Sequence, residues 1–199
     1  KPATGDGENM AWTNSDNWDS PGKDPGAGII IPRAGDIANV NIALQSNIAV
    51  TFDSAPVTGI LNVGDAGSGN YDISFGGGQT RALTLNNGTD EARINKTSGN
   101  TVTFIRSLSF VSNTVLSVED GLFSVSSGNA RLLGGGSLTV EGGGIATFNS
   151  NATSATFSSG FDGDLSIRSN GTLLIDNTLL ASTAAPSATV TVQSTGHLG

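Results

Sequence analysis

The chain has 199 residues, a formal net charge of −8, 28 Gly, no Cys and only 13% charged residues. This length allows one domain or several stacked repeat units. Without Cys, the chain has neither a disulfide framework nor a Cys-based metal site or nucleophile. Its Lys and Arg residues are scattered singly and form no basic stripe that could neutralise phosphates, which argues against nucleic acid as a partner.

Residues 1–28 differ from the rest of the chain, because they hold both Trp residues, Trp12 and Trp18, among many turn formers. We expect this range to form an irregular N-terminal cap. The two Trp side chains are predicted to close the end of a hydrophobic core. The alternative is a carbohydrate contact, since aromatic faces pack on sugar rings.

The cap also contains a loose cluster of side-chain oxygens, from Asp16, Asn17, Asp19 and Asp24. Their spacing is similar to that of an oxygen cage for Ca²⁺, but the Gly and terminal Glu of an EF-hand loop are missing. A surface turn is therefore the favoured interpretation. We expect no cofactor, with Ca²⁺ as the alternative.

From residue 29 onward, short runs alternate apolar and polar residues, as in Ala38–Ile42 and Ile48–Phe52, and turn formers separate the runs. A period of two predicts one strand after another. The composition is poor in strong helix formers and rich in strand and turn formers, which favours the same all-β fold. We expect residues 29–199 to form the main body of the protein.

An internal repeat organises these strands. Six phrases share an apolar-polar-apolar run followed by Gly five or six positions after the run begins, and they start at intervals of 22, 33, 22, 27 and 25 residues. The six are Leu61-Asn62-Val63 with Gly67, Leu83-Thr84-Leu85 with Gly88, Leu116-Ser117-Val118 with Gly121, Leu138-Thr139-Val140 with Gly144, Leu165-Ser166-Ile167 with Gly171, and Val190-Thr191-Val192 with Gly196.

A unit of about 20 to 30 residues has the size of one coil of a β-helix. Stacked coils pair their strands in parallel and line a narrow core with ladders of apolar side chains. We therefore predict a right-handed parallel β-helix (β-solenoid), with a β-sandwich as the rival fold. The interval of 33 residues predicts either an inserted loop between residues 90 and 100 or an extra strand at Leu108-Ser109-Phe110.

Phrases such as GGSLTVEGGG at residues 135–144 and SNGTL at residues 169–173 resemble the passenger regions of autotransporter-type adhesins and the autotransporter-associated β-strand repeat proteins. The resemblance implies a secreted or cell-surface location, outside the outer membrane of a Gram-negative bacterium. It also implies a translocator barrel beyond residue 199 as the membrane-bound part. The chain is accordingly expected to be a fragment of a longer protein.

Few residues suit catalysis. A Ser-His-Asp triad needs a His, and His197, the only one, lies near the end of the chain at an expected turn. Two pairs of acids, Asp162 with Asp164 and Glu119 with Asp120, lie beside Gly, which favours plain turns over carboxylates that act on a sugar. Outward Thr residues lack the regular rows of an ice-binding face.

We therefore expect a structural or adhesive module, a rigid rod whose loops contact glycans or the surface proteins of host or other cells. No catalytic, cofactor or metal residues are assigned. The alternative is a polysaccharide-acting enzyme of the pectate-lyase type, for which Arg131 near Glu119 and Asp120 is the one candidate combination. A third possibility is a stalk whose binding head lies elsewhere in a longer chain.

Overall fold

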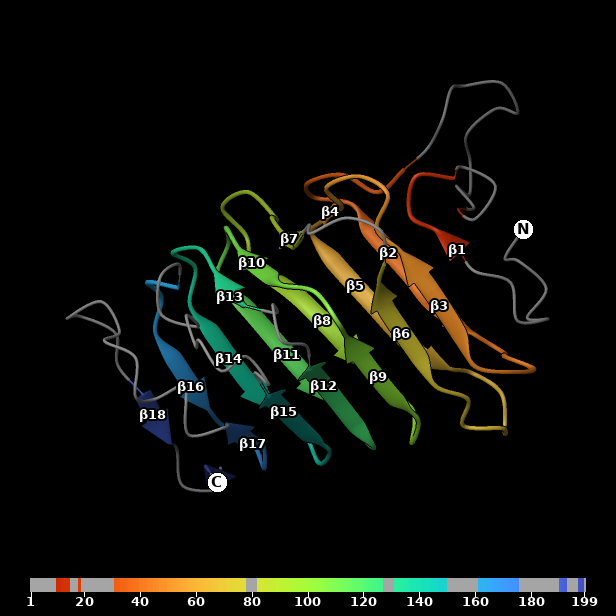
Figure 1. Ribbon diagram of the computed structural model, residues 1–199. Coiled ribbons are helices and arrows are strands. Elements are labelled where there is room, and N and C mark those ends of the chain that lie inside the picture. Colours follow the sequence, from red (N-terminus) through yellow and green to blue (C-terminus); the bar gives the residue numbers. More distant parts are fainter. Residues whose placement is uncertain are drawn as a thin grey trace.

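The computed structural model shows short strands stacked side by side along one axis (Figure 1). It describes residues 10–14, 18, 31–77, 82–126, 131–149, 161–175, 190–192 and 197–198. These residues form a parallel β-solenoid of about 5 turns, which confirms the predicted all-β class and β-helix. The strand pairs between coils are parallel, so the β-sandwich is wrong. None of the described segments is a helix long and apolar enough to span a membrane.

The strands form three parallel sheets, which we number I to III. Sheet I contains β1 (Met10–Ala11), β3 (Ile48–Thr51), β6 (Ile73–Gly76), β9 (Thr101–Phe104), β12 (Leu122–Ser126), β15 (Ile145–Asn149), β17 (Thr172–Ile175) and β19 (His197–Leu198). Sheet II contains β2 (Ile37–Ile42), β5 (Ile60–Asp65), β8 (Ala92–Lys96), β11 (Thr114–Val118), β14 (Leu138–Glu141), β16 (Leu165–Ile167) and β18 (Val190–Val192). Sheet III contains β4 (Val57–Thr58), β7 (Leu83–Leu85), β10 (Leu108–Phe110) and β13 (Leu132–Leu133).

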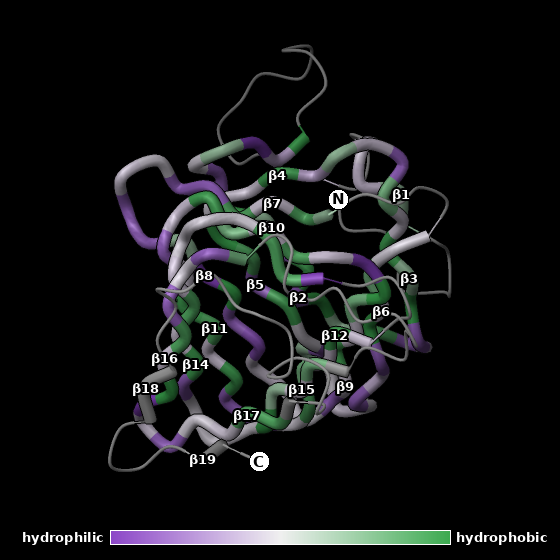
Figure 2. Tube along the Cα trace, turned by 60° about the vertical axis from the view of Figure 1, so that its left-hand side comes forward, coloured by the Kyte–Doolittle hydropathy of each residue, from purple (hydrophilic) through white to green (hydrophobic). Residues whose placement is uncertain are grey.

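In each full coil the chain passes through sheets II, I and III in that order. Thus β5, β6 and β7 form one coil, and β8 then stacks on β5. Along the strands, buried positions alternate with more exposed ones, as in β8 and β14, and Figure 2 shows the corresponding alternation of hydropathy along the strands. One side of every strand therefore faces a core shared by all coils.

Aromatic rings line the core behind sheet I. Ring centroids lie 5.9 Å apart between Trp12 and Phe52, 6.2 Å between Phe52 and Phe75, 4.5 Å between Phe75 and Phe104, and 5.3 Å between Phe104 and Phe123. The rings of Phe75 and Phe104 stack with an interplanar angle of 5°. Register places Phe75 and Phe104 directly opposite each other on neighbouring strands. Val50 pairs with Phe75 and Val125 with Phe104, so Phe52 and Phe123 join the aromatic ladder from positions two residues away from these register partners.

The structure corrects the assignment of one repeat phrase. Leu83-Thr84-Leu85 is β7 in sheet III, whereas the other five phrases lie in sheet II. In sheet II it is Ile94 of β8 that pairs with both Leu61 and Leu116. The expected extra strand at Leu108–Phe110 is β10, which stacks on β7 as an ordinary member of sheet III.

One step between the phrases of sheet II is offset by two residues, whereas Leu138, Leu165 and Val190 are register partners. Leu138 pairs with Thr114, and Leu116 pairs with Val140. Because side chains along a strand alternate between the two faces, a shift of two residues keeps every apolar position directed inward. The repeat therefore tolerates this offset without exposing its core residues.

Only residues 10–14 and 18 of the predicted cap are described. Met10 and Ala11 form β1, which pairs in parallel with Val50 and Thr51 of β3. Residues 10 and 11 therefore add one more strand to sheet I.

Candidate functional site

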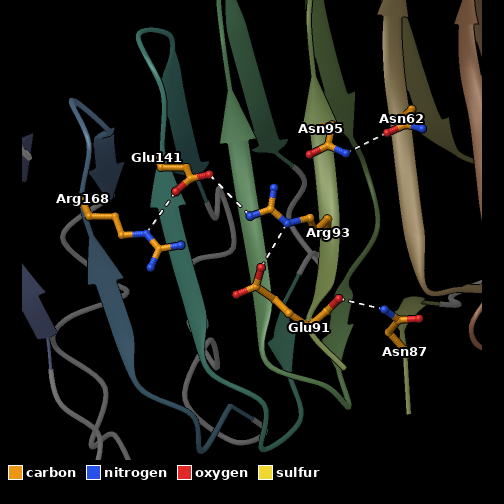
Figure 3. A network of polar contacts seen from close by, with 7 residues as sticks. All are labelled: Asn62, Asn87, Glu91, Arg93, Asn95, Glu141 and Arg168. Carbon is orange, nitrogen blue, oxygen red and sulfur yellow. Dashed lines mark hydrogen bonds and ion pairs between the residues drawn. The ribbon is translucent and has the colours of Figure 1, made fainter. Parts of the chain in front are cut away.

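The outward face of sheet II carries a polar row, which we define as Asn39, Asn62, Asn95, Ser117 and Glu141, at paired positions on successive strands. Asn62 Nδ2 donates to Asn39 Oδ1 at 2.6 Å, and Asn95 Nδ2 donates to Asn62 Oδ1 at 2.8 Å. The latter contact is drawn in Figure 3. Asn62 thus donates to the previous coil while its oxygen accepts from the next, so these three amides tie coils together on the outside of the stack.

An ion-pair network continues from this row (Figure 3). Arg93 Nε lies 3.0 Å from Glu91 Oε1, and its Nη2 lies 3.8 Å from Glu141 Oε1. Arg168 Nε donates to Glu141 Oε2 at 3.0 Å. Two guanidinium groups and two carboxylates therefore neutralise one another across four coils of the stack, since β8, β11, β14 and β16 are consecutive in sheet II.

Arg93 reaches Glu141 by crossing β11, the strand between them. On that strand, Val115 pairs with Arg93 on one side and with Thr139 on the other. Val115 points outward and is nevertheless buried, with 1% of its surface exposed. The aliphatic stem of an arginine covers apolar surface while its charged end stays in water, which accounts for a buried Val outside the core.

Chemically, this network offers a surface of hydrogen-bonding groups. Both carboxylates are engaged by guanidinium groups, and the backbone oxygen of Glu91 accepts from Asn87 Nδ2 at 2.8 Å. In the part of the chain that the structure describes, no three His, Cys, Asp or Glu side chains gather in a way that could hold a metal ion.

A second polar cluster lies inside the corner between sheets II and I. Lys96 points inward and is fully buried. Its Nζ donates to the backbone oxygens of Ser98 and Asp120, the latter at 2.8 Å, and to Asn100 Oδ1 at 3.1 Å. Burial lowers the pKa of Lys96 to about 8, against a smaller opposing attraction from Asp120 and Asp72. The lysine links its own corner to that of the next coil.

One coil earlier, the same corner holds a buried carboxylate. Asp65 Oδ1 accepts from the backbone N–H groups of Leu44 at 3.0 Å and Gly67 at 2.8 Å, and Oδ2 accepts from that of Tyr71 at 2.9 Å. Burial works to raise the pKa of Asp65, but these N–H groups outweigh it and hold the pKa below its ordinary value. Through these hydrogen bonds, Asp65 and Lys96 therefore hold the backbone at the corners of the fold.

Trp12 lies at the end of the aromatic ladder, fully buried. Trp18 packs on it with ring centroids 4.9 Å apart and donates from Nε1 to the Trp12 oxygen at 2.7 Å. Trp12 thus extends the core, and Trp18 covers it. The carbohydrate contact suggested for these two residues stays a prediction.

The other candidates from the sequence are spread over the coils. Glu119 and Asp120 are exposed between β11 and β12, and Asp120 Oδ1 accepts from the next N–H, of Gly121, at 2.7 Å. Arg131 directly precedes β13, at another corner of the coil. Asp162 and Asp164 are both exposed.

One prediction falls outside the described residues, and another concerns a residue whose side chain is not described. The cluster of oxygens suggested for Ca²⁺ lies wholly among undescribed residues. His197 is expected at a turn but belongs to strand β19, which pairs with β17, so that expectation is wrong; only its backbone is described.

Comparison with known proteins adds no relative. The chain matches no protein-family model, and neither the curated proteins nor the solved structures give a significant match. The fold defines the chain as a parallel β-solenoid protein. The narrower resemblance to autotransporter passengers stays a prediction.

Proposed function

We propose that this chain is an adhesive module of a bacterial surface or secreted protein, a rigid rod that contacts other surfaces along its length. The observation that supports it best is the arrangement of outward side chains in rows that run from coil to coil, such as the polar row of sheet II. Such rows present many weak contacts in a regular line, and weak contacts that act together give strong attachment.

The charges support the same interpretation. Arg93 and Arg168 are both engaged by carboxylates of this chain. A guanidinium that is already paired must give up its carboxylate and part of its hydration before it can bind an external ion. The network therefore favours ligands that add hydrogen bonds over ligands that replace an existing ion pair. Secretion and attachment to a larger surface protein belong to this proposal.

A flow assay tests the proposal. Latex beads that carry the protein covalently are settled on films of cellulose, alginate and gelatin, and the beads that stay under increasing shear are counted. Beads that carry serum albumin are the control. We expect several-fold greater retention of the protein-coated beads on at least one film. Equal retention of both kinds of bead on all three films contradicts the proposal.

The enzymatic alternative stays a prediction with its own assay. Release of reducing ends or unsaturated products from soluble pectate or glucan, lost in the Glu119→Gln variant but kept in Glu141→Gln, would favour an enzyme. Adhesion without such release favours the module proposed above.

A further inference from the structure

The outward face of sheet I has a composition opposite to that of sheet II. None of the eight strands of sheet I contains Asp, Glu, Lys or Arg, although the whole chain has a net charge of −8. We define the neutral face as the outward residues of β6, β9, β12, β15 and β17. They are Ser74, Thr101, Thr103, Leu122, Ser124, Ser126, Ile145, Thr147, Thr172 and Leu174.

Hydroxyl groups form one row of the neutral face. Ser74 pairs with Thr103, Thr103 with Ser124, and Ser124 with Thr147. With neighbouring strands about 4.8 Å apart, this row spans about 14 Å along the axis. Ser74 Oγ donates weakly to the Ile48 oxygen at 3.4 Å. For the other three hydroxyls, the described residues supply no hydrogen-bond partner; Thr103 and Thr147 are half-buried, and Ser124 between them is buried, with 7% of its surface exposed.

Aliphatic side chains flank the hydroxyl row. Leu122 and Ile145 pair with each other in the row beside the hydroxyls. Leu174 pairs with Thr147 and so occupies the next position of the hydroxyl row. Ile145 and Leu174 are each 41% exposed, and Ile105, at the end of β9, is 36% exposed. Three of the five exposed large hydrophobic residues in the described part of the chain thus belong to sheet I or its edge. The face combines unpaired hydroxyls with exposed aliphatic surface and lacks charge.

We infer that the neutral face binds an uncharged, insoluble polysaccharide with a flat surface. The inference rests on the proposed adhesive function and names its ligand class. A sugar ring offers hydroxyls at its rim and C–H groups on its faces, which complements rows of hydroxyls beside rows of aliphatic groups. A charged polymer would lose solvation here without gaining a partner ion, so charge matching favours a neutral one.

The side chains also argue for a polymer surface over other occupants. Protein interfaces depend on Trp, Tyr and Arg as energetic centres, and none of these is among the residues of the neutral face. A single soluble sugar binds tightly when a concave site surrounds it, whereas this face consists of sheet residues alone. Affinity therefore has to accumulate over many equivalent contacts, as on a particle of packed chains.

A depletion assay with cellulose particles tests the inference. Protein is mixed with microcrystalline cellulose and with carboxymethylated cellulose particles, and the unbound fraction is measured at low and high salt. We expect binding to plain cellulose that salt hardly changes, because no ion pair is involved, and weaker binding to the charged particles.

Two matched double variants locate the contact. Thr103→Lys with Thr147→Lys adds two charges to the neutral face, and Ile37→Lys with Asn41→Lys adds the same charge to exposed outward positions of β2 in sheet II, outside the polar row. We expect the first pair to weaken the partition constant about tenfold or more, since each added ammonium must lose water on contact. The second pair should leave binding unchanged. Circular dichroism and thermal melting confirm that both variants fold.

Three results would overturn the inference. The first is that the folded wild type does not bind cellulose, and the second is that both double variants lose binding equally. The third is self-association in sedimentation that only the Thr103 and Thr147 double variant abolishes, because the face would then be a contact between copies of the chain. Beads that still adhere to gelatin or alginate in the flow assay, while cellulose is not bound, would remove this ligand and retain the adhesive function.

Discussion

Sheet I packs aromatic rings into the core and has no charged residue in its strands, whereas sheet II packs aliphatic side chains inward and carries Arg93 and Glu141 outward. Both sheets nevertheless stack strand on strand with the same parallel pairing. The solenoid thus requires apolar side chains at the inward positions of every coil and leaves the chemistry of the outward positions free. Two neighbouring faces of one rod can therefore meet different partners.

The aromatic ladder provides the largest expected effect. Phe104→Ala removes a ring that lies between Phe75 and Phe123, and we expect a loss of about 3–5 kcal/mol in the free energy of unfolding. Urea titration followed by circular dichroism measures it. Thr103→Ala, one residue away but outward, is the control and should change stability by less than about 0.5 kcal/mol. Similar losses for the two variants would mean that the ring is not part of a packed ladder.

The buried Lys96, at a corner between sheets II and I, should make the free energy of unfolding depend on pH. Its pKa is about 8 in the folded chain and 10.5 ordinarily, so between these values the unfolded chain binds more protons. Stability should therefore rise with pH through this window, by up to about 3 kcal/mol. Lys96→Met should remove this rise. Urea titrations of both proteins at several pH values measure the difference, and parallel pH profiles would contradict the assignment.

The ion-pair network should contribute least. Glu141→Gln replaces the carboxylate that Arg93 and Arg168 share, and we expect a loss of about 0.5–1 kcal/mol at low salt that shrinks as salt rises. Thermal melts at several salt concentrations measure it. The control is Glu119→Gln, at an exposed position for which the described residues supply no ion pair. A loss that does not depend on salt would indicate packing, such as the cover over Val115, as the main role of the network.

The coil architecture was predictable because inward positions must be apolar in every coil and corners need turn formers. The assignment of phrases to sheets was not. Leu83-Thr84-Leu85 and Leu138-Thr139-Val140 are equivalent as local patterns, yet one forms part of sheet III and the other part of sheet II. Only the long-range pairing of strands, which depends on the length of the corners between them, separates the two.

The polar network on sheet II was not predicted, because Arg93 and Glu141 meet through a register that spans two coils. Local spacing holds no sign of such a contact. The buried lysine did leave a signal. In Ala92-Arg93-Ile94-Asn95-Lys96 it occupies the same phase as the two apolar residues, so alternation alone places Lys96 inward.

The direction of the inter-coil hydrogen bonds has a mechanical consequence. These bonds lie along the stacking axis, so tension on that axis pulls one coil away from the next and breaks the bonds of a few short strands at a time. Register partners such as Leu61, Ile94 and Leu116 are 33 and 22 residues apart, so each detached coil releases about 75 to 110 Å of extended chain. Under load the protein would lengthen in discrete steps, as an extensible tether that absorbs a sudden pull.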